Sequence, residues 1–155
     1  MNYLNMKRAK LAQHYFLEGY NCSQSVFLSF LDLVDMNKEQ ALKMVSGLGA
    51  GISRLREISG AISAITLVVG ILYGYSSPDA YQEKNELYAR VQKLAFEFKR
   101  EKGSYVCKDL LKLEGPSIPI SQRRTPEYYK SRPCLKNVGI AAGILEKYLQ
   151  DNPYK

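Results

Sequence analysis

Apolar residues recur at helical spacing along almost the whole chain, and short breaks of glycine, proline and polar residues divide them into segments. The pattern predicts helices over approximately residues 4–17, 22–33, 37–47, 58–73, 77–100, 107–114 and 133–149. We find no pair of strand-like segments and no internal repeat. The sequence therefore predicts an all-α fold, a single-domain helical bundle of about six or seven helices over residues 1–155.

The stretch from Ile58 to Tyr75 carries no charged residue. Its length is close to the minimum of about 18 residues for a bilayer-spanning helix. Ser59, Ser63 and the interspersed glycines favour a helix surrounded by protein instead. We therefore expect a buried central helix from Ile58 to Tyr73 and no membrane span.

Two further segments are predicted to lie outside the regular helices. Gly47-Leu48-Gly49-Ala50-Gly51 superficially resembles a phosphate-binding loop, but no strand precedes it. It is better interpreted as a helix end followed by a tight turn where backbones approach closely. Residues 115–131, with three prolines and several basic side chains, are predicted to form an irregular loop.

Size and charge narrow the classes of function. The 155 residues suffice for one core without disulfides, and the net charge of +7 is a weak indication of anionic partners. No recognisable nucleic-acid-binding module accompanies the charge, so no specific nucleic-acid binding is expected. The N-terminal segment lacks the pattern of a secretory signal, and we expect a cytoplasmic protein with reduced cysteines.

The main candidates for chemistry are the three cysteines, Cys22, Cys107 and Cys134. Each lies where a helix is predicted to begin, and a helix N-terminus stabilises a thiolate. We interpret them as candidate catalytic redox thiols and as candidate metal ligands. Zinc, an iron–sulfur centre or another soft-metal centre is the cofactor that such ligands would bind. Burial of structural thiols is the alternative, and the spacing does not show whether the three converge.

Other polar residues near these positions have simpler interpretations. His14, the only histidine, is interpreted as an exposed or satisfied helix residue rather than a ligand or base. Glu18, Glu57 and Asp109 could orient a ligand but are interpreted as structural or solvated carboxylates. Tyr20 and Tyr105 are close to cysteines in the sequence and are candidates to shield a site from solvent.

These segments together resemble a family of small putative redox-active proteins defined by an early cysteine, a CGAxxG motif and two later cysteines. The resemblance covers most of the chain and is carried by four segments, Gly19–Val26, Gly47–Arg54, Cys107–Leu111 and Pro133-Cys134. The central motif departs from the pattern, because this chain reads Ser59-Gly60-Ala61-Ile62-Ser63-Ala64. Ser59 and Gly60 are thus the candidate cofactor-binding positions of a degenerate motif.

Ser59 changes what the site could do. A serine cannot form a disulfide and is a poor ligand for a soft metal, so an activity that needs four sulfurs is in question. Three thiolates could still hold a metal, with water, Ser59 or His14 completing the shell.

Three functional hypotheses follow. The first is a redox-active or soft-metal-binding protein that uses Cys22, Cys107 and Cys134. The second is a noncatalytic helical module that binds a small ligand or a partner protein. The third is a membrane-associated transporter accessory protein, because the stretch from Ile58 to Tyr75 is uncharged and the resemblance implies members encoded among transporter genes. The expected partners are accordingly a second copy of the chain or a transporter-associated protein.

Overall fold

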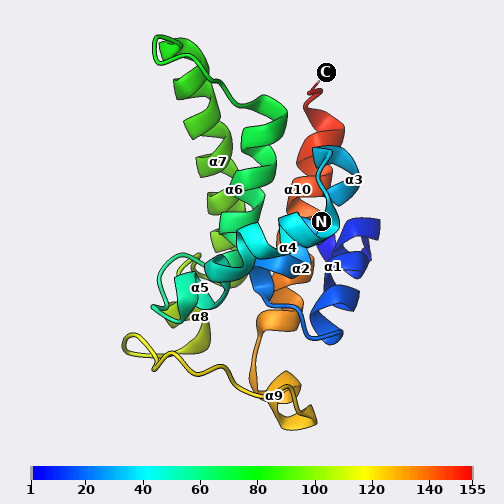
Figure 1. The fold of residues 1–155 in the computed structure, drawn as a ribbon, viewed down its shortest axis with the longest axis vertical. Helices are drawn as coiled ribbons and strands as arrows, with labels where there is room; N and C mark the ends of the chain where they lie inside the picture. Colours follow the sequence, from blue (N-terminus) through cyan, green and yellow to red (C-terminus); the bar gives the residue numbers. More distant parts are fainter. Residues whose placement is uncertain (1, 155) are drawn as a thin grey trace.

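The computed structural model describes residues 2–154, and most of them are helical (Figure 1). The N-terminal part contains η1 (Tyr3–Asn5), α1 (Lys7–Leu17), α2 (Cys22–Leu28), α3 (Leu31–Val34), α4 (Lys38–Val45), η2 (Ser46–Leu48) and α5 (Gly49–Ser53). It is followed by α6 (Gly60–Tyr73), α7 (Tyr81–Lys102), α8 (Cys107–Leu111), α9 (Pro126–Ser131) and α10 (Cys134–Asp151). Within residues 2–154 the only strand-like pairing is an isolated bridge between Ile58 and Val106. The prediction of an all-α bundle is confirmed.

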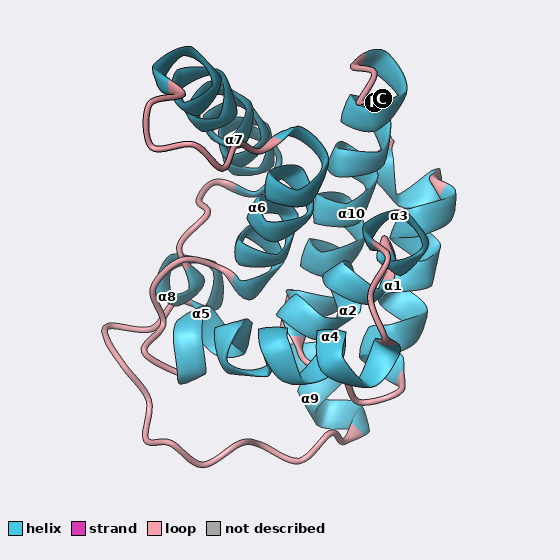
Figure 2. Ribbon diagram, turned by 45° about the horizontal axis from the view of Figure 1, so that its top comes forward, coloured by secondary structure: helices cyan, strands magenta, loops and turns pink. Residues whose placement is uncertain are grey.

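The long helices form the body of the molecule, and the short ones gather at one end. Helices α6 and α7 lie side by side and are joined at the top of the view, while α10 packs between α6 and α1 (Figure 1). Helices α5, α8 and α9 lie at the opposite end, where a long loop runs from α8 to α9 (Figure 2). No helix among residues 2–154 has both the length and the apolar character needed to cross a bilayer.

Helix α10 shares the central position that the sequence assigned to residues 58–73. It contacts η1, α1, α2, α6 and α7, and its residues from Asn137 to Leu145 are all buried. Glycines allow this packing, since a Cβ at Gly143 would lie 2.5 Å from the carbonyl oxygen of Tyr3. Helix α6 is less enclosed than expected, and Ile71 near its end is 48% exposed.

The prediction of a single helix over residues 22–33 is wrong. Helix α2 ends at Leu28, and the chain leaves helical geometry at Phe30, before α3. Arg8 donates a hydrogen bond of 2.7 Å to the carbonyl oxygen of Ser29, and the Ser29 hydroxyl bonds to Val26. These contacts occupy backbone acceptors that a continuous helix would use.

Other boundaries also differ from the prediction. The first helix is interrupted at Met6, which is extended, and α7 begins at Tyr81 rather than near Pro78. Helix α9 lies in the segment predicted to be irregular, where the Thr125 hydroxyl accepts a hydrogen bond from the Tyr128 amide. Thr125 followed by Pro126 is a recognisable helix start that the sequence interpretation missed.

Candidate cysteine site

The three cysteines begin three helices, as the sequence predicts: Cys22 opens α2, Cys107 opens α8 and Cys134 opens α10. All three are free thiols. Their side chains line an inner cavity of about 20 Å³ together with Ser59 and Asn137. The same three cysteines line a neighbouring outer cavity of about 230 Å³. The fold thus brings together residues from distant parts of the sequence at the end of the bundle where α5 and α8 lie (Figure 1).

Cys22 is held by a capped helix start. The Asn21 side chain accepts a hydrogen bond from the Gln24 amide, and the Gln24 side chain accepts one from the Asn21 amide. Asn21 also donates to the carbonyl oxygen of Ser46 at 3.0 Å, which ties α2 to the segment after α4. This capping box fixes the backbone that carries the Cys22 sulfur.

A left-handed turn covers the Cys22 thiol. Ala50, Gly51, Ile52, Ser53 and Arg54 all have positive φ, between 51° and 71°. A left-handed conformation costs roughly 1–2 kcal/mol for each non-glycine residue, so the surrounding contacts must hold this turn in place. Its role is visible at Ala50, whose backbone N–H donates a hydrogen bond to the Cys22 sulfur.

Backbone hydrogen bonds fix Cys107 beside this turn. The Cys107 amide donates to the carbonyl oxygen of Glu57 at 2.6 Å, and the Ser59 amide donates to that of Tyr105 at 2.9 Å. Gly51 permits the close approach, because a Cβ there would lie 2.6 Å from the Cys107 Cβ. The tight turn predicted over residues 47–51 therefore serves to bring α5 against α8.

Cys22 and Cys134 behave as one proton-sharing pair. A hydrogen bond from the Cys134 thiol is the largest influence on Cys22 and, with the Ala50 amide and the charge of Arg124, lowers its pKa to about 6 against the opposing effect of burial. The same hydrogen bond, burial and the negative charge on Cys22 raise the pKa of Cys134 above its ordinary value. One proton therefore stays on Cys134, and Cys22 is the thiolate.

Cys107 differs from this pair. Burial raises its pKa, although the Arg56 guanidinium donates a hydrogen bond to its sulfur at 3.6 Å and opposes the shift. The charge on Cys22 raises the pKa further. Cys107 is therefore a neutral thiol next to a buried cation.

Ser59 occupies the cavity wall and also performs a structural task. It is the N-cap of α6 and accepts a hydrogen bond from the Ala61 amide at 3.3 Å. Gly60 lets the start of α6 approach its neighbours, since a Cβ there would lie 2.9 Å from the carbonyl oxygen of Leu48. Both residues line the inner cavity, as does Asn137, whose buried Oδ1 has no hydrogen-bond partner within residues 2–154.

The arrangement does not fit a metal centre. Across the described part of the chain, no group of three or more histidine, cysteine or acidic side chains is placed so that it could hold a metal ion. Cys22 and Cys134 instead interact with each other, and their pKa values shift in opposite directions. The site supports thiol chemistry, and we derive no step that involves a metal.

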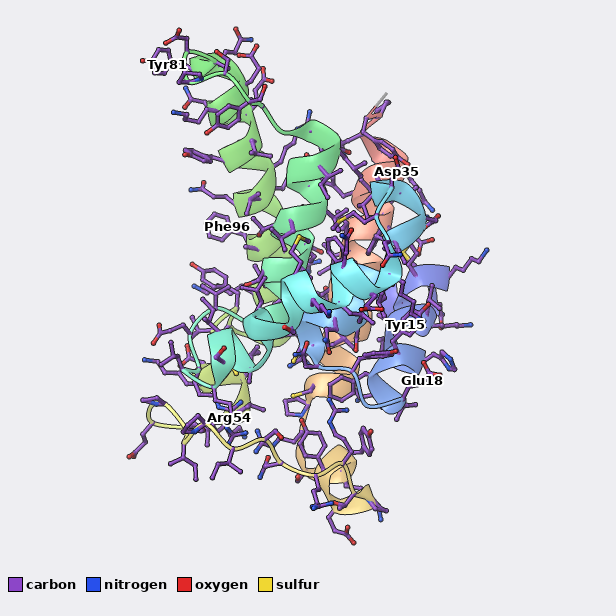
Figure 3. The ribbon with its side chains drawn as sticks, in the orientation of Figure 1. Tyr15, Glu18, Asp35, Arg54, Tyr81 and Phe96 are labelled. Atoms are coloured by element: carbon purple, nitrogen blue, oxygen red, sulfur yellow. The ribbon has the colours of Figure 1, made fainter. Side chains whose placement is uncertain are left out.

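The remaining sequence candidates lie away from the sulfurs. His14 is 64% exposed in its side chain and pairs with Glu18 at 3.5 Å. Glu18 lies on the surface at the end of α1 (Figure 3). Glu57 and Asp109 are exposed, as the sequence interpretation expected. Tyr20 and Tyr105 do not line either cavity; instead, the Tyr20 carbonyl oxygen accepts a hydrogen bond from Arg124 at 2.8 Å.

The residues that surround the cysteines could not be identified from the sequence. Arg56, Arg124 and Asn137 belong to no motif, and their roles depend on contacts between distant segments. The loop with Arg124 was recognised only as basic. Arg56 lies in the largely polar stretch Ser53-Arg54-Leu55-Arg56-Glu57 before Ile58, so no periodic pattern indicates that it is buried.

The fold and the site define a class: a small helical protein in which three free thiols, one with a lowered pKa, line a shared cavity. The family model described as "Putative redox-active protein (C_GCAxxG_C_C)" matches residues 20–148. The chain belongs to this family, as its resemblance indicated. No curated protein and no solved structure matched the chain in the other two comparisons.

The family name writes the central motif as GCAxxG rather than CGAxxG. With either order of the motif, this chain lacks the cysteine of the central motif, because no cysteine lies between Cys22 and Cys107. The three remaining cysteines are the ones that the structure places around one cavity.

Proposed function

We propose that this protein is a thiol–disulfide redox protein in which Cys22 is the attacking thiolate and Cys134 is the resolving thiol. The observation that carries the proposal is that Cys22 and Cys134 line the same two cavities, where the interaction between their side chains shifts their pKa values in opposite directions. A thiolate near neutral pH is the reactive form in disulfide exchange, and a second thiol in contact with it can complete the exchange.

The chemistry takes a disulfide, RSSR, as the oxidant. The Cys22 thiolate attacks one sulfur of RSSR, a Cys22–SR bond forms, and the first RS⁻ leaves. Cys134 then loses its proton to water and attacks the Cys22 sulfur, which releases the second RS⁻. Two electrons pass from the cysteine pair to RSSR, and an external dithiol restores the reduced protein by the reverse steps.

Ser59 suits this two-cysteine mechanism. The pair needs only Cys22 and Cys134, so the missing fourth sulfur does not prevent it. Cys107 has no role in either step and stays protonated. A reducing compartment such as the cytoplasm would keep the resting protein in the thiol form that the mechanism requires.

The experiment is oxidation of the reduced protein with a small disulfide, followed by peptide mapping. We expect a loss of two hydrogen atoms and a crosslink between Cys22 and Cys134. Cys134→Ser should stop at the mixed disulfide on Cys22, and Cys107→Ser should still form the crosslink. A crosslink that requires Cys107, or no intramolecular crosslink at all, would contradict the proposal.

A further inference from the structure

The wall of the outer cavity is strongly basic. Four arginines line it, Arg54, Arg56, Arg124 and Arg132, and no aspartate or glutamate does. The neutral polar side chains in the wall, apart from the cysteines, are those of Asn21, Ser46, Ser53, Ser121, Gln122 and Tyr128. A cavity of about 230 Å³ with this lining has the size and the donors for a small molecule.

The protein leaves most of the charge of these arginines unbalanced, because the Cys22 thiolate is the one anionic group among the side chains that line the cavity. Within residues 2–154, none of the four forms an ion pair with a carboxylate. Arg56 is only 3% exposed, and its guanidinium bonds to the Ser117 hydroxyl at 3.0 Å and to the neutral Cys107 thiol. A buried cation without a counter-ion is costly, and charged side chains are rarely buried unless they are paired.

The arginines also crowd one another. Burial lowers the pKa of Arg54, and the positive charges of Arg56 and Arg132 lower it further. Arg124 lines the cavity and is held there by hydrogen bonds to the carbonyl oxygens of Phe16 and Tyr20, both at 2.8 Å. An anion among these groups would relieve the repulsion that the folded chain otherwise retains.

We propose that the outer cavity binds a small anion, whose carboxylate or oxyanion group lies among the guanidinium groups of Arg54, Arg56 and Arg132. Guanidinium groups bind such anions through paired, charge-assisted hydrogen bonds. The cavity also contains Cys22. The disulfide that Cys22 attacks is therefore anionic, a conclusion that rests on the proposed redox function. Anion binding itself does not require the thiols.

The first experiment compares two disulfides as oxidants of Cys22 at low ionic strength. The anionic probe is 5,5′-dithiobis(2-nitrobenzoate), and the neutral probe is 4,4′-dithiodipyridine. We expect Arg54→Gln and Arg132→Gln each to reduce the rate with the anionic probe by about tenfold, the effect of one charge-assisted hydrogen bond. The rate with the neutral probe should change less than twofold.

Arg123→Gln is the matched control, because Arg123 is exposed, does not line the cavity and contributes equally to the net charge. It should leave both rates unchanged. In the unsubstituted protein, inorganic sulfate should slow the reaction of Cys22 with the anionic probe but not with the neutral probe. This comparison needs no substitution, so it tests the site without any risk of misfolding. Equal losses of rate with the anionic probe in Arg123→Gln and Arg54→Gln, or a rate that sulfate does not change, would overturn the proposed anion site.

A second measurement separates this inference from the redox proposal. Cys22→Ser protein, which cannot form the disulfide, is titrated with inorganic sulfate by NMR. Binding that weakens in Cys22→Ser combined with Arg132→Gln supports the anion site even if no Cys22–Cys134 crosslink forms. Absence of sulfate binding overturns the anion site even if that crosslink forms.

Discussion

Replacing Cys134 with alanine tests the proton-sharing pair most directly. The substitution removes the hydrogen bond that contributes most to the low pKa of Cys22. A hydrogen bond to a charged group is worth about 1.5–3 kcal/mol, and one pKa unit corresponds to about 1.4 kcal/mol. We therefore expect the pKa of Cys22 to rise from about 6 by roughly one to two units.

This shift has a measurable effect on reactivity. At pH 7 a pKa of about 6 leaves roughly nine-tenths of Cys22 as thiolate, and the variant should retain between about a half and a tenth. Alkylation of Cys22 by iodoacetamide at pH 7 should slow by about two- to tenfold, because the thiolate is the reactive form. The assay follows the rate from pH 4.5 to 9 and identifies Cys22 by peptide mass spectrometry.

Two controls decide whether the reasoning is correct. Cys134→Ser keeps a hydroxyl donor and should keep the pKa of Cys22 low, whereas Cys107→Ala removes a thiol that is not among the largest influences on Cys22. An unchanged pH profile in Cys134→Ala would refute the assignment of Cys134 as the donor. A similar rise in the pKa of Cys22 in Cys107→Ala would mean that Cys107 and Cys134 affect Cys22 in the same way.

Three further predictions concern stability. Gly51→Ala should lower the free energy of unfolding by at least about 2 kcal/mol, because it adds left-handed backbone strain and a clash with the Cys107 Cβ. Gly103→Ala has open space around the new Cβ, so it should lower the free energy of unfolding only by the backbone strain of about 1–2 kcal/mol. Ser59→Ala should cost about 1 kcal/mol as a lost N-cap and leave the pH profile of Cys22 alkylation unchanged. The stability of the reduced protein relative to Cys22→Ser should increase from about pH 6 to about pH 9, because the folded pKa lies below the ordinary value of 9.0.

Denaturant unfolding measures all three effects. Equal losses in the two glycine variants would argue against close packing of α5 on α8. A changed alkylation profile in Ser59→Ala would mean that Ser59 acts on the thiols as well as on α6. A stability difference that falls or stays constant between pH 6 and pH 9 would contradict a Cys22 thiolate in the folded protein.

Local patterns predicted the helical fold and the starts of the cysteine helices. The N-cap at Asn21 and the start at Pro133-Cys134 depend on neighbouring residues, which is why they could be predicted from the sequence. The break after Leu28 could not, because it depends on Arg8, a residue of another helix.

The candidate site was predictable in its sulfurs but not in its surroundings. The cysteines were identified from the sequence, whereas their convergence arises from the packing of α2, α8 and α10. The donor to Cys22 at Ala50 comes from a left-handed turn of mostly non-glycine residues, which sequence propensity disfavours. Arg56 and Arg124 matter because of where other segments place them.

The position of the two paired thiols in the sequence gives oxidation a second consequence. A bond between Cys22 and Cys134 would close a loop containing most of the chain, and a crosslink around about 100 residues restricts the unfolded ensemble by roughly 4–5 kcal/mol. The oxidised protein would thus be the more resistant to unfolding. Redox state and lifetime of the fold would then be coupled, so that a change of electron supply would alter how long the molecule survives as well as how it reacts.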